Sequence, residues 1–234
     1  MRWALCTDDI YYASSLLTPM LALGRTLPVK RHLGVDQPLL GKFADKLRQG
    51  EWCHIFAEGR IRQPWRFARG EPVLGGFKPG VSRILFRCKE PPLVIPMYHI
   101  GMHGVCPEEP CPAYLPAKLQ TAYPAGGNRV RVYVGEPVDV WPIVLRWREG
   151  FPGQPGLGDM SGEPWGRCCA AGFDVERRCY AEIADALREA VLKLEAKARR
   201  DYFRDKGGVA HVEEAAEAAE VVAALELDAA STTV

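Results

Sequence analysis

The apolar positions of the first hundred residues form short runs, and the stretches between the runs have helical spacing. The runs at 26–31, 52–56 and 93–98 predict three strands. Between the strands, two sets of apolar residues recur at i, i+3 and i+4 and predict helices: Leu39, Leu40, Phe43 and Leu47, then Val81, Ile84, Leu85 and Cys88. This alternation predicts an α/β fold with a mixed, largely parallel sheet flanked by helices.

The second half of the chain has a different pattern. Apolar and polar residues alternate at 130–134, which predicts a further strand. Residues 150–172 hold seven glycines and three prolines without any period, so we expect a flexible insertion over 150–173 rather than a core element. A carboxy-terminal helix follows, with its apolar face formed by Tyr180, Ile183, Ala184, Leu187, Val191, Leu194 and Ala198. We expect one domain over 1–206 and an acidic, Ala- and Glu-rich tail over 207–234.

Charge is distributed unevenly, although the net charge is only +1. The tail holds six acidic residues and no Lys or Arg, which leaves +7 on residues 1–206. Residues 60–89 alone carry eight cations against one acid. Such a segment attracts anions, either phospholipid headgroups or nucleic acid. Because no aromatic stacking motif accompanies the charge, we expect no nucleic acid partner.

The eight cysteines lack the spacing of a small disulfide scaffold, and we expect most of them to be free thiols. Nitrogen and sulfur ligands do gather in one short stretch, at His99, His103, Cys106 and Cys111. Three prolines stiffen this stretch, and its spacing matches no common zinc module. We therefore expect no metal site.

The longest uncharged run extends from Ile10 to Gly24. It is too short to span a hydrocarbon core, which needs roughly 20 residues, and it contains Pro19. Two interpretations stay open. The run is either a packed segment of the fold or an interfacial anchor that dips into one leaflet of a membrane.

The strand predicted at Trp52 is followed directly by polar residues and glycine, in the order Glu58, Gly59 and Arg60. The carboxyl ends of strands are where open α/β sheets present groups that bind ligands. On its own, Glu-Gly is an ordinary turn. The residues around it favour a functional role for this turn.

Over roughly residues 2 to 145 the chain resembles the tafazzin family of glycerolipid acyltransferases, with its family-like stretches in family order. The residues that carry the resemblance are Arg2-Trp3-Ala4-Leu5, Leu23 to Arg31, Phe43 to Leu47, Trp52 to Arg60, Phe77 to Val81, Ile95 to Met102 and Val134 to Pro137. The stretch around Glu58 is similar to the family's Phe-Pro-Glu-Gly signature, with Ala57 in place of proline.

The resemblance implies a substrate-binding set formed by Arg31, Glu58, Gly59, Arg60 and Lys78. The implied role of the arginines is to bind the headgroup phosphate, and that of the glycine is to let the backbone approach the ligand. The glutamate holds either the glycerol hydroxyls or Arg31. Lys78 either lines the headgroup groove or belongs to a solvated helix face. Arg60 replaces the usual lysine and keeps the charge.

A further cation, Arg83, also stands at a family position. It is interpreted either as part of the headgroup groove or as part of a solvated helix face. The family's His-x4-Asp motif, whose histidine is the general base, is absent from the sequence, so no catalytic residue is assigned.

The implied activity is that of a phospholipid–lysophospholipid acyltransferase or transacylase, with cardiolipin among its substrates. The resemblance also implies no cofactor, peripheral association with a membrane, and a mitochondrial location. Because the base is missing, we expect this chain to be an amino-terminally truncated form without activity of its own. The alternative is a non-catalytic lipid-binding remnant.

Overall fold

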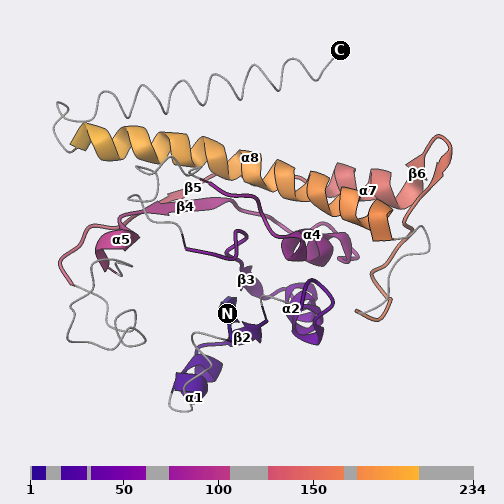
Figure 1. Ribbon diagram of the computed structural model, residues 1–234, viewed down its shortest axis with the longest axis horizontal. Coiled ribbons are helices and arrows are strands. Elements are labelled where there is room, and N and C mark those ends of the chain that lie inside the picture. Colours follow the sequence, from indigo (N-terminus) through magenta and orange to yellow (C-terminus); the bar gives the residue numbers. More distant parts are fainter. Residues whose placement is uncertain are drawn as a thin grey trace. The chain divides into compact units, whose positions relative to one another are not determined.

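The computed structural model describes residues 2–8, 17–30, 33–61, 74–105, 126–165 and 173–205 (Figure 1). The chain divides into two compact units. The first comprises Met1–Val94 and Pro137–Arg188, and the second Ile95–Glu136 and Glu189–Val234. The predicted start of the acidic tail lies outside the described residues and stays a prediction.

A three-stranded parallel sheet forms the centre of the first unit. Its strands are β1 (Arg2–Thr7), β2 (Thr26–Val29) and β3 (Trp52–His54), in the order β2-β1-β3. Ala4 of β1 is opposite Thr26 on one side and opposite His54 on the other. The parallel arrangement is confirmed. The central strand β1, however, is an element that the hydrophobic pattern did not predict.

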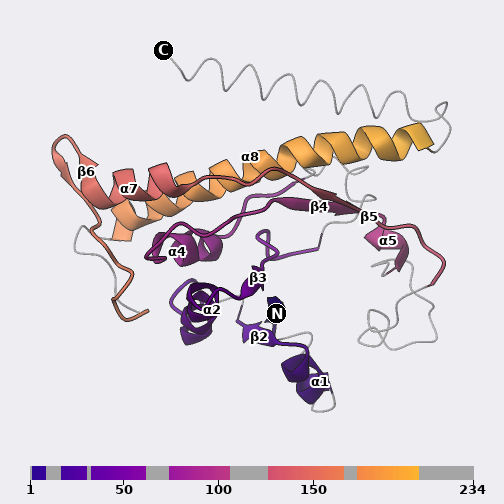
Figure 2. The ribbon, with the colours of Figure 1, turned by 180° about the vertical axis from the view of Figure 1, so that it is seen from behind.

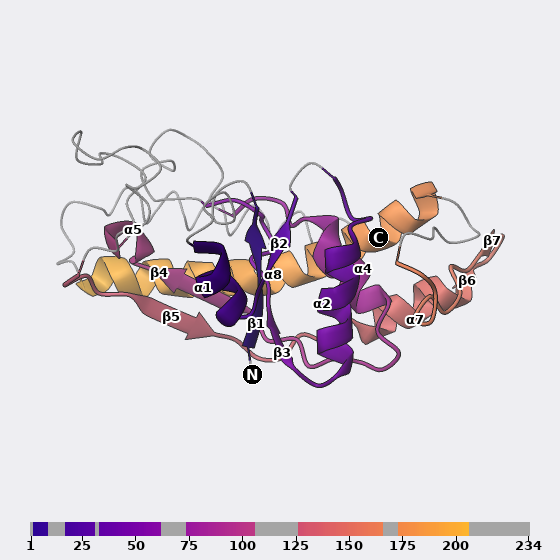
Figure 3. The same cartoon turned by 90° about the horizontal axis from the view of Figure 1, so that it is seen from below.

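Two helices pack beside this sheet, α2 (Pro38–Arg48) and α4 (Pro79–Phe86), and Figure 3 shows α2 running alongside the strands. Both were predicted from apolar spacing. The facing side chains of the two helices form one buried cluster of Leu40, Phe43, Ala44 and Ile84. Side chains of all three strands pack against this cluster. Proline stands in the first turn of each helix, where its missing N–H costs no intrahelical hydrogen bond.

A second, larger cluster joins α4 to α7 (Trp141–Glu149) and to the first part of α8 (Phe173–Asp205), which lies beside α7 (Figure 2). Its buried members include Phe86, Val144, Trp147, Cys179, Tyr180, Ile183 and Leu187. The face predicted for the carboxy-terminal helix is therefore buried over this part. Two i,i+4 ion pairs form along α8, from Lys193 to Glu189 and from Arg199 to Glu195.

The segment that starts at Gly150 contains regular structure and buried side chains. It forms a short hairpin from β6 (Gly150–Phe151) and β7 (Gln154–Pro155). Leu157 and Met160 are then buried in the larger cluster. The amide of Leu157 donates to the carbonyl of Trp147 at 2.9 Å, so backbone hydrogen bonds hold the segment where no periodic pattern exists. Residues 150–165 thus contribute two buried side chains to the larger cluster, and the flexible insertion over 150–173 as a whole stays a prediction.

The second unit contains an antiparallel pair, β4 (Met97–Ile100) and β5 (Arg131–Val134), with the short helix α5 (Met102–Val105). The strand predicted at 93–98 begins four residues later than expected. It pairs with β5 instead of extending the parallel sheet. Local apolar runs specify that a strand forms but not which strand it pairs with.

The uncharged run has one described element, α1 (Leu17–Leu23), whose Leu23 side chain is 85% exposed. Across the described ranges, no helix combines the length and the apolar character needed to cross a bilayer. Four described cysteines are free thiols: Cys6, Cys53, Cys88 and Cys179. Cys106 and Cys111 of the possible zinc stretch lie outside the described residues.

Candidate functional site

The candidate site lies at the carboxyl edge of the parallel sheet. Because β1, β2 and β3 run in the same direction, the residues that follow them emerge at one edge: Asp8, Lys30 and the turn after His54. β2 and β3 flank β1, with Val29 opposite Thr7 and His54 opposite Ala4, so β3 ends three residues earlier along β1 than β2 does. This edge is where α/β sheets bind ligands.

A tight turn follows β3 and contains the predicted Glu58 and Gly59. The amide of Gly59 donates to the carbonyl of Phe56 at 3.1 Å and closes the turn. Gly59 has a φ of 64°, in the left-handed region that side chains with a Cβ rarely adopt. Glu58 is half-buried beside it. The glycine is therefore required by the backbone of the turn, whatever its role toward a ligand.

Lys78 lies against this turn, although it is 19 residues away from Gly59 in the sequence. Its amide donates to the carbonyl of Ala57 at 2.8 Å, and a Cβ built on Gly59 would lie 3.3 Å from the Lys78 Cγ. This hydrogen bond restrains the turn at Ala57, where the family signature has a rigid proline. Lys78 is also the N-cap residue of α4, whose amino end carries partial positive charge.

The segment that leads into Lys78 is held from α8. Arg188 donates from its Nε to the carbonyl of Gly75 at 3.1 Å and from its Nη2 to the carbonyl of Leu74 at 2.9 Å. Both acceptors are buried residues. Arg188 thus fixes the start of the segment whose far end contacts the turn, a role that the helical pattern gave no means of predicting.

The structure brings Glu58, Gly59, Arg60 and Lys78 of the predicted set together, while Arg31 lies outside the described residues. The chain on both sides of Arg31 is fixed by the buried side chain of Gln37. Its Oε1 accepts from the amide of Lys30 at 2.8 Å, and its Nε2 donates to the carbonyls of Lys30 and Gly34, each at 2.7 Å.

Arg83 lies neither in a headgroup groove nor on a solvated helix face, the two interpretations that the sequence left open. Its side chain is only 2% exposed, and its Nη1 pairs with Asp36 Oδ1 at 2.6 Å. Its Nη2 donates to the carbonyl of Trp165, and its guanidinium lies 5.3 Å from the centre of the Trp165 ring. Arg83 is therefore a buried structural cation that pins residue 165. It belongs to no headgroup groove and to no solvated face.

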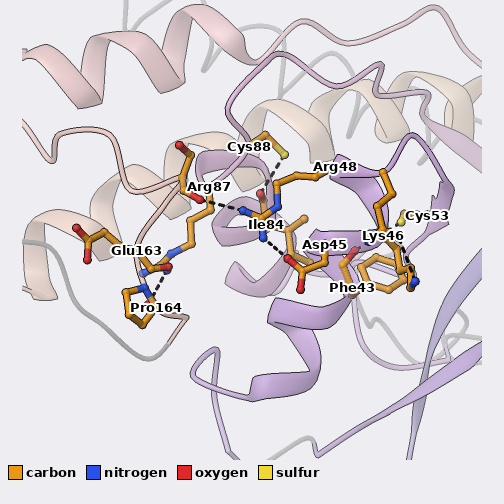
Figure 4. A network of polar contacts seen from close by, with 12 residues as sticks. Phe43, Asp45, Lys46, Arg48, Cys53, Ile84, Arg87, Cys88, Glu163 and Pro164 are labelled. Atoms are coloured by element: carbon orange, nitrogen blue, oxygen red, sulfur yellow. Dashed lines mark hydrogen bonds and ion pairs between the residues drawn. The ribbon is translucent and has the colours of Figure 1, made fainter.

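Arg87 is also buried, and Figure 4 shows its contacts with Glu163 and Pro164. Its Nη1 donates to the carbonyls of Glu163 and Pro164 at 3.1 and 2.9 Å. Burial, assisted by nearby Arg83, lowers the pKa of the Arg87 guanidinium. Two of the eight cations in the basic segment are therefore enclosed in the fold, whereas Arg60, Lys78 and Lys89 are exposed.

Asp8 is a candidate that sequence reasoning missed. It follows the central strand at the same edge, and its amide donates to the carbonyl of Val29 at 3.2 Å. It escaped notice because β1 was not predicted as a strand.

His54, the last residue of β3, contacts the Phe56 ring edge-on, with ring centroids 4.7 Å apart. Over the described ranges, no group of His, Cys, Asp and Glu is arranged to hold a metal ion.

The site thus presents exposed cations, a carboxylate and a glycine turn at one sheet edge. Cations and helix amino ends favour phosphate, and a carboxylate accepts hydrogen bonds from hydroxyl groups. Fold and site together define an α/β protein whose sheet edge presents groups of the kind that bind anions.

Several curated proteins have sequences similar to this chain. Tafazzin from Drosophila melanogaster is 28% identical over 145 residues, which cover 62% of this chain and 34% of that protein. The protein named Taffazin from Dictyostelium discoideum is 33% identical over 110 residues, covering 45% of this chain and 36% of its own length. N-acylphosphatidylethanolamine synthase from Arabidopsis thaliana is 25% identical over 138 residues, with 59% and 45% covered. No family model matches the chain.

These matches confirm the resemblance to the tafazzin family. The chain spans less than half the length of the curated relatives described above.

Proposed function

We propose that this chain carries the headgroup-binding site of a tafazzin-type acyltransferase or transacylase, which moves fatty acyl chains between phospholipids and lysophospholipids without a bound cofactor. One observation carries the proposal. The turn at Glu58 and Gly59 lies at the carboxyl edge of the sheet, beside Arg60 and in contact with Lys78. Cardiolipin and its lyso form are the proposed substrates, at a mitochondrial membrane to which the protein associates peripherally.

The proposed roles follow from the chemistry of each group. Arg60 and Lys78, with Arg31, bind the headgroup phosphate. Glu58 accepts hydrogen bonds from glycerol hydroxyl groups, and Gly59 lets the backbone approach the ligand. A headgroup held in this way is positioned for transfer, but the proton of the attacking hydroxyl needs a base.

That base is not assigned to any residue of this chain. The sequence contains no His-x4-Asp, and general base catalysis typically contributes a factor of about 10² to 10⁴. We therefore expect residues 1–234 to bind lysophospholipid without measurable transfer. A non-catalytic lipid-binding protein is the alternative.

The similarity to a protein named N-acylphosphatidylethanolamine synthase adds a second acceptor to consider. In that case the acyl chain would be transferred to the amine of phosphatidylethanolamine rather than to a glycerol hydroxyl. The same phosphate-binding groups would serve both acceptors. Monolysocardiolipin and phosphatidylethanolamine therefore belong in one assay.

The first test measures saturable binding of monolysocardiolipin in neutral detergent micelles. We expect Glu58→Ala, or Arg60→Gln with Lys78→Gln, to weaken binding about tenfold, since hydrogen bonds to charged groups contribute roughly 1.5–3 kcal/mol. Lys89→Gln removes an exposed cation from the same basic segment and should leave binding unchanged. An unaltered affinity in the Glu58 and Arg60/Lys78 variants would contradict the site.

The second test follows labelled linoleoyl chains from phosphatidylcholine to each acceptor. Turnover by residues 1–234 would contradict the absence of a base. Turnover by a protein that also carries any in-frame coding sequence upstream of Met1 would support the enzyme. Binding without turnover in either form would favour the non-catalytic alternative.

A further inference from the structure

Large apolar side chains surround the candidate turn and point into solvent. Phe56, immediately before the turn, is 61% exposed, and Ile61, immediately after it, is 57% exposed. In the loop that follows β2, Leu33 is 60% exposed. All three belong to loops that leave the carboxyl edge of the parallel sheet.

Exposed cations share this edge. Lys30 follows β2, Arg60 lies within the same turn segment as Phe56 and Ile61, and Lys78 touches Gly59. We call these three cations and the three apolar residues the carboxyl-edge rim. Apolar side chains interspersed with Lys and Arg match the surface of an anionic bilayer, where rings and aliphatic groups enter the acyl boundary and cations meet the headgroups.

The opposite edge of the sheet offers a comparison within the same unit. Trp52, at the start of β3, is 61% exposed, as Phe56 is. Cations lie near it as well, since Arg2 is its partner on the neighbouring strand and Arg25 pairs with Glu51 across 3.8 Å. Exposed apolar surface is therefore present at both edges, but at the carboxyl edge it lies on both sides of the candidate turn.

We infer that the carboxyl-edge rim docks on an anionic lipid bilayer, with Phe56 and Ile61 inserted on either side of the turn. In this orientation Glu58 and Gly59 face the headgroup layer, so a phospholipid reaches the turn without leaving the membrane. The inference rests on the proposed function for the identity of the bound headgroup. It goes further by assigning the membrane contact to named residues of the first unit.

The test measures the partition of residues 1–234 into phosphatidylcholine vesicles with and without cardiolipin, by flotation. We expect Phe56→Ser and Ile61→Ser each to weaken partition into cardiolipin vesicles about tenfold, because each removes apolar surface from the membrane. Trp52→Ser is the matched control and should leave partition unchanged. Phe56→Trp should retain it, since Trp favours membrane interfaces. Circular dichroism verifies that every variant is folded.

Three outcomes would overturn the inference. Partition of Phe56→Ser and Ile61→Ser equal to wild type would show that the rim does not enter the bilayer. An equal loss in Trp52→Ser would show a general effect of surface hydrophobicity. Self-association of the lipid-free chain that Phe56→Ser abolishes, with vesicle partition unaffected, would assign the rim to a second copy of the chain.

Failure of the rim and failure of the proposed function give different results. Rim-dependent partition without saturable monolysocardiolipin binding in micelles would contradict the function and leave the docking surface standing. Saturable binding in micelles, together with rim variants that partition like the wild type, would support the function and contradict the docking surface.

Discussion

At the scale of single residues, the surroundings of each charged side chain decide whether it can reach a ligand. Glu58, Gly59 and Lys78 were singled out from a motif, and they occupy one turn and its neighbour. Arg83 was singled out in the same way and is buried. A cation in a sequence carries no sign of whether its guanidinium meets solvent or a set of carbonyl groups. The burial of Arg83 depends on its partners at 36 and 165, and that of Arg87 on its partners at 163 and 164, all of which are distant in the chain.

Substitution of Gly59 tests whether the turn needs glycine. Gly59→Ala should lower the free energy of unfolding by about 1 kcal/mol, because the residue is held at a φ of 64°. The added Cβ would also lie 3.3 Å from the Lys78 side chain. Gly76→Ala is the control, since nothing lies within 4 Å of a Cβ at that position. Urea unfolding measures both. Equal stability of the two variants would mean that the turn is unstrained.

At the scale of elements, three helices were predictable from their apolar spacing, whereas α7 and the strand partners were not. α2, α4 and the buried face of α8 follow a 3.6-residue period that the sequence displays directly. β1 has neither alternation nor β-branched residues before Thr7, so its central place depends on the two strands that pair with it. The segment 150–165 is ordered by hydrogen bonds and by Trp165, neither of which produces a period.

The contact between α4 and residue 165 gives a prediction at this scale. Arg83→Gln should destabilise the protein by about 2 kcal/mol, because it breaks the ion pair with the exposed carboxylate of Asp36 and removes the donor to the carbonyl of Trp165. Lys89→Gln, an exposed change in the same basic segment, should stay within about 0.5 kcal/mol. Denaturant unfolding compares the two variants. A stable Arg83→Gln protein with impaired binding of monolysocardiolipin would instead indicate that Arg83 belongs to the headgroup site.

At the scale of the whole molecule, net charge overstates the positive surface that a membrane would meet. Residues 60–89 have a net charge of +7 in the sequence, but Arg83 and Arg87 are enclosed by protein groups. The cations that remain exposed among the described residues of this segment are Arg60, Lys78 and Lys89. Of these, Lys89 follows the far end of α4, about 12 Å along the helix from Lys78.

Salt dependence of vesicle binding tests this reduced charge. Partition into cardiolipin vesicles should fall as salt rises from 0.1 to 1 M, since the screening length shortens from about 10 to 3 Å. It should not vanish, because the apolar contacts of Phe56 and Ile61 resist screening. Arg60→Gln with Lys78→Gln should flatten the salt response, whereas Lys89→Gln should alter it less. Equal partition into neutral and cardiolipin vesicles at low salt would remove the electrostatic contribution and leave the apolar side chains alone to bind the membrane.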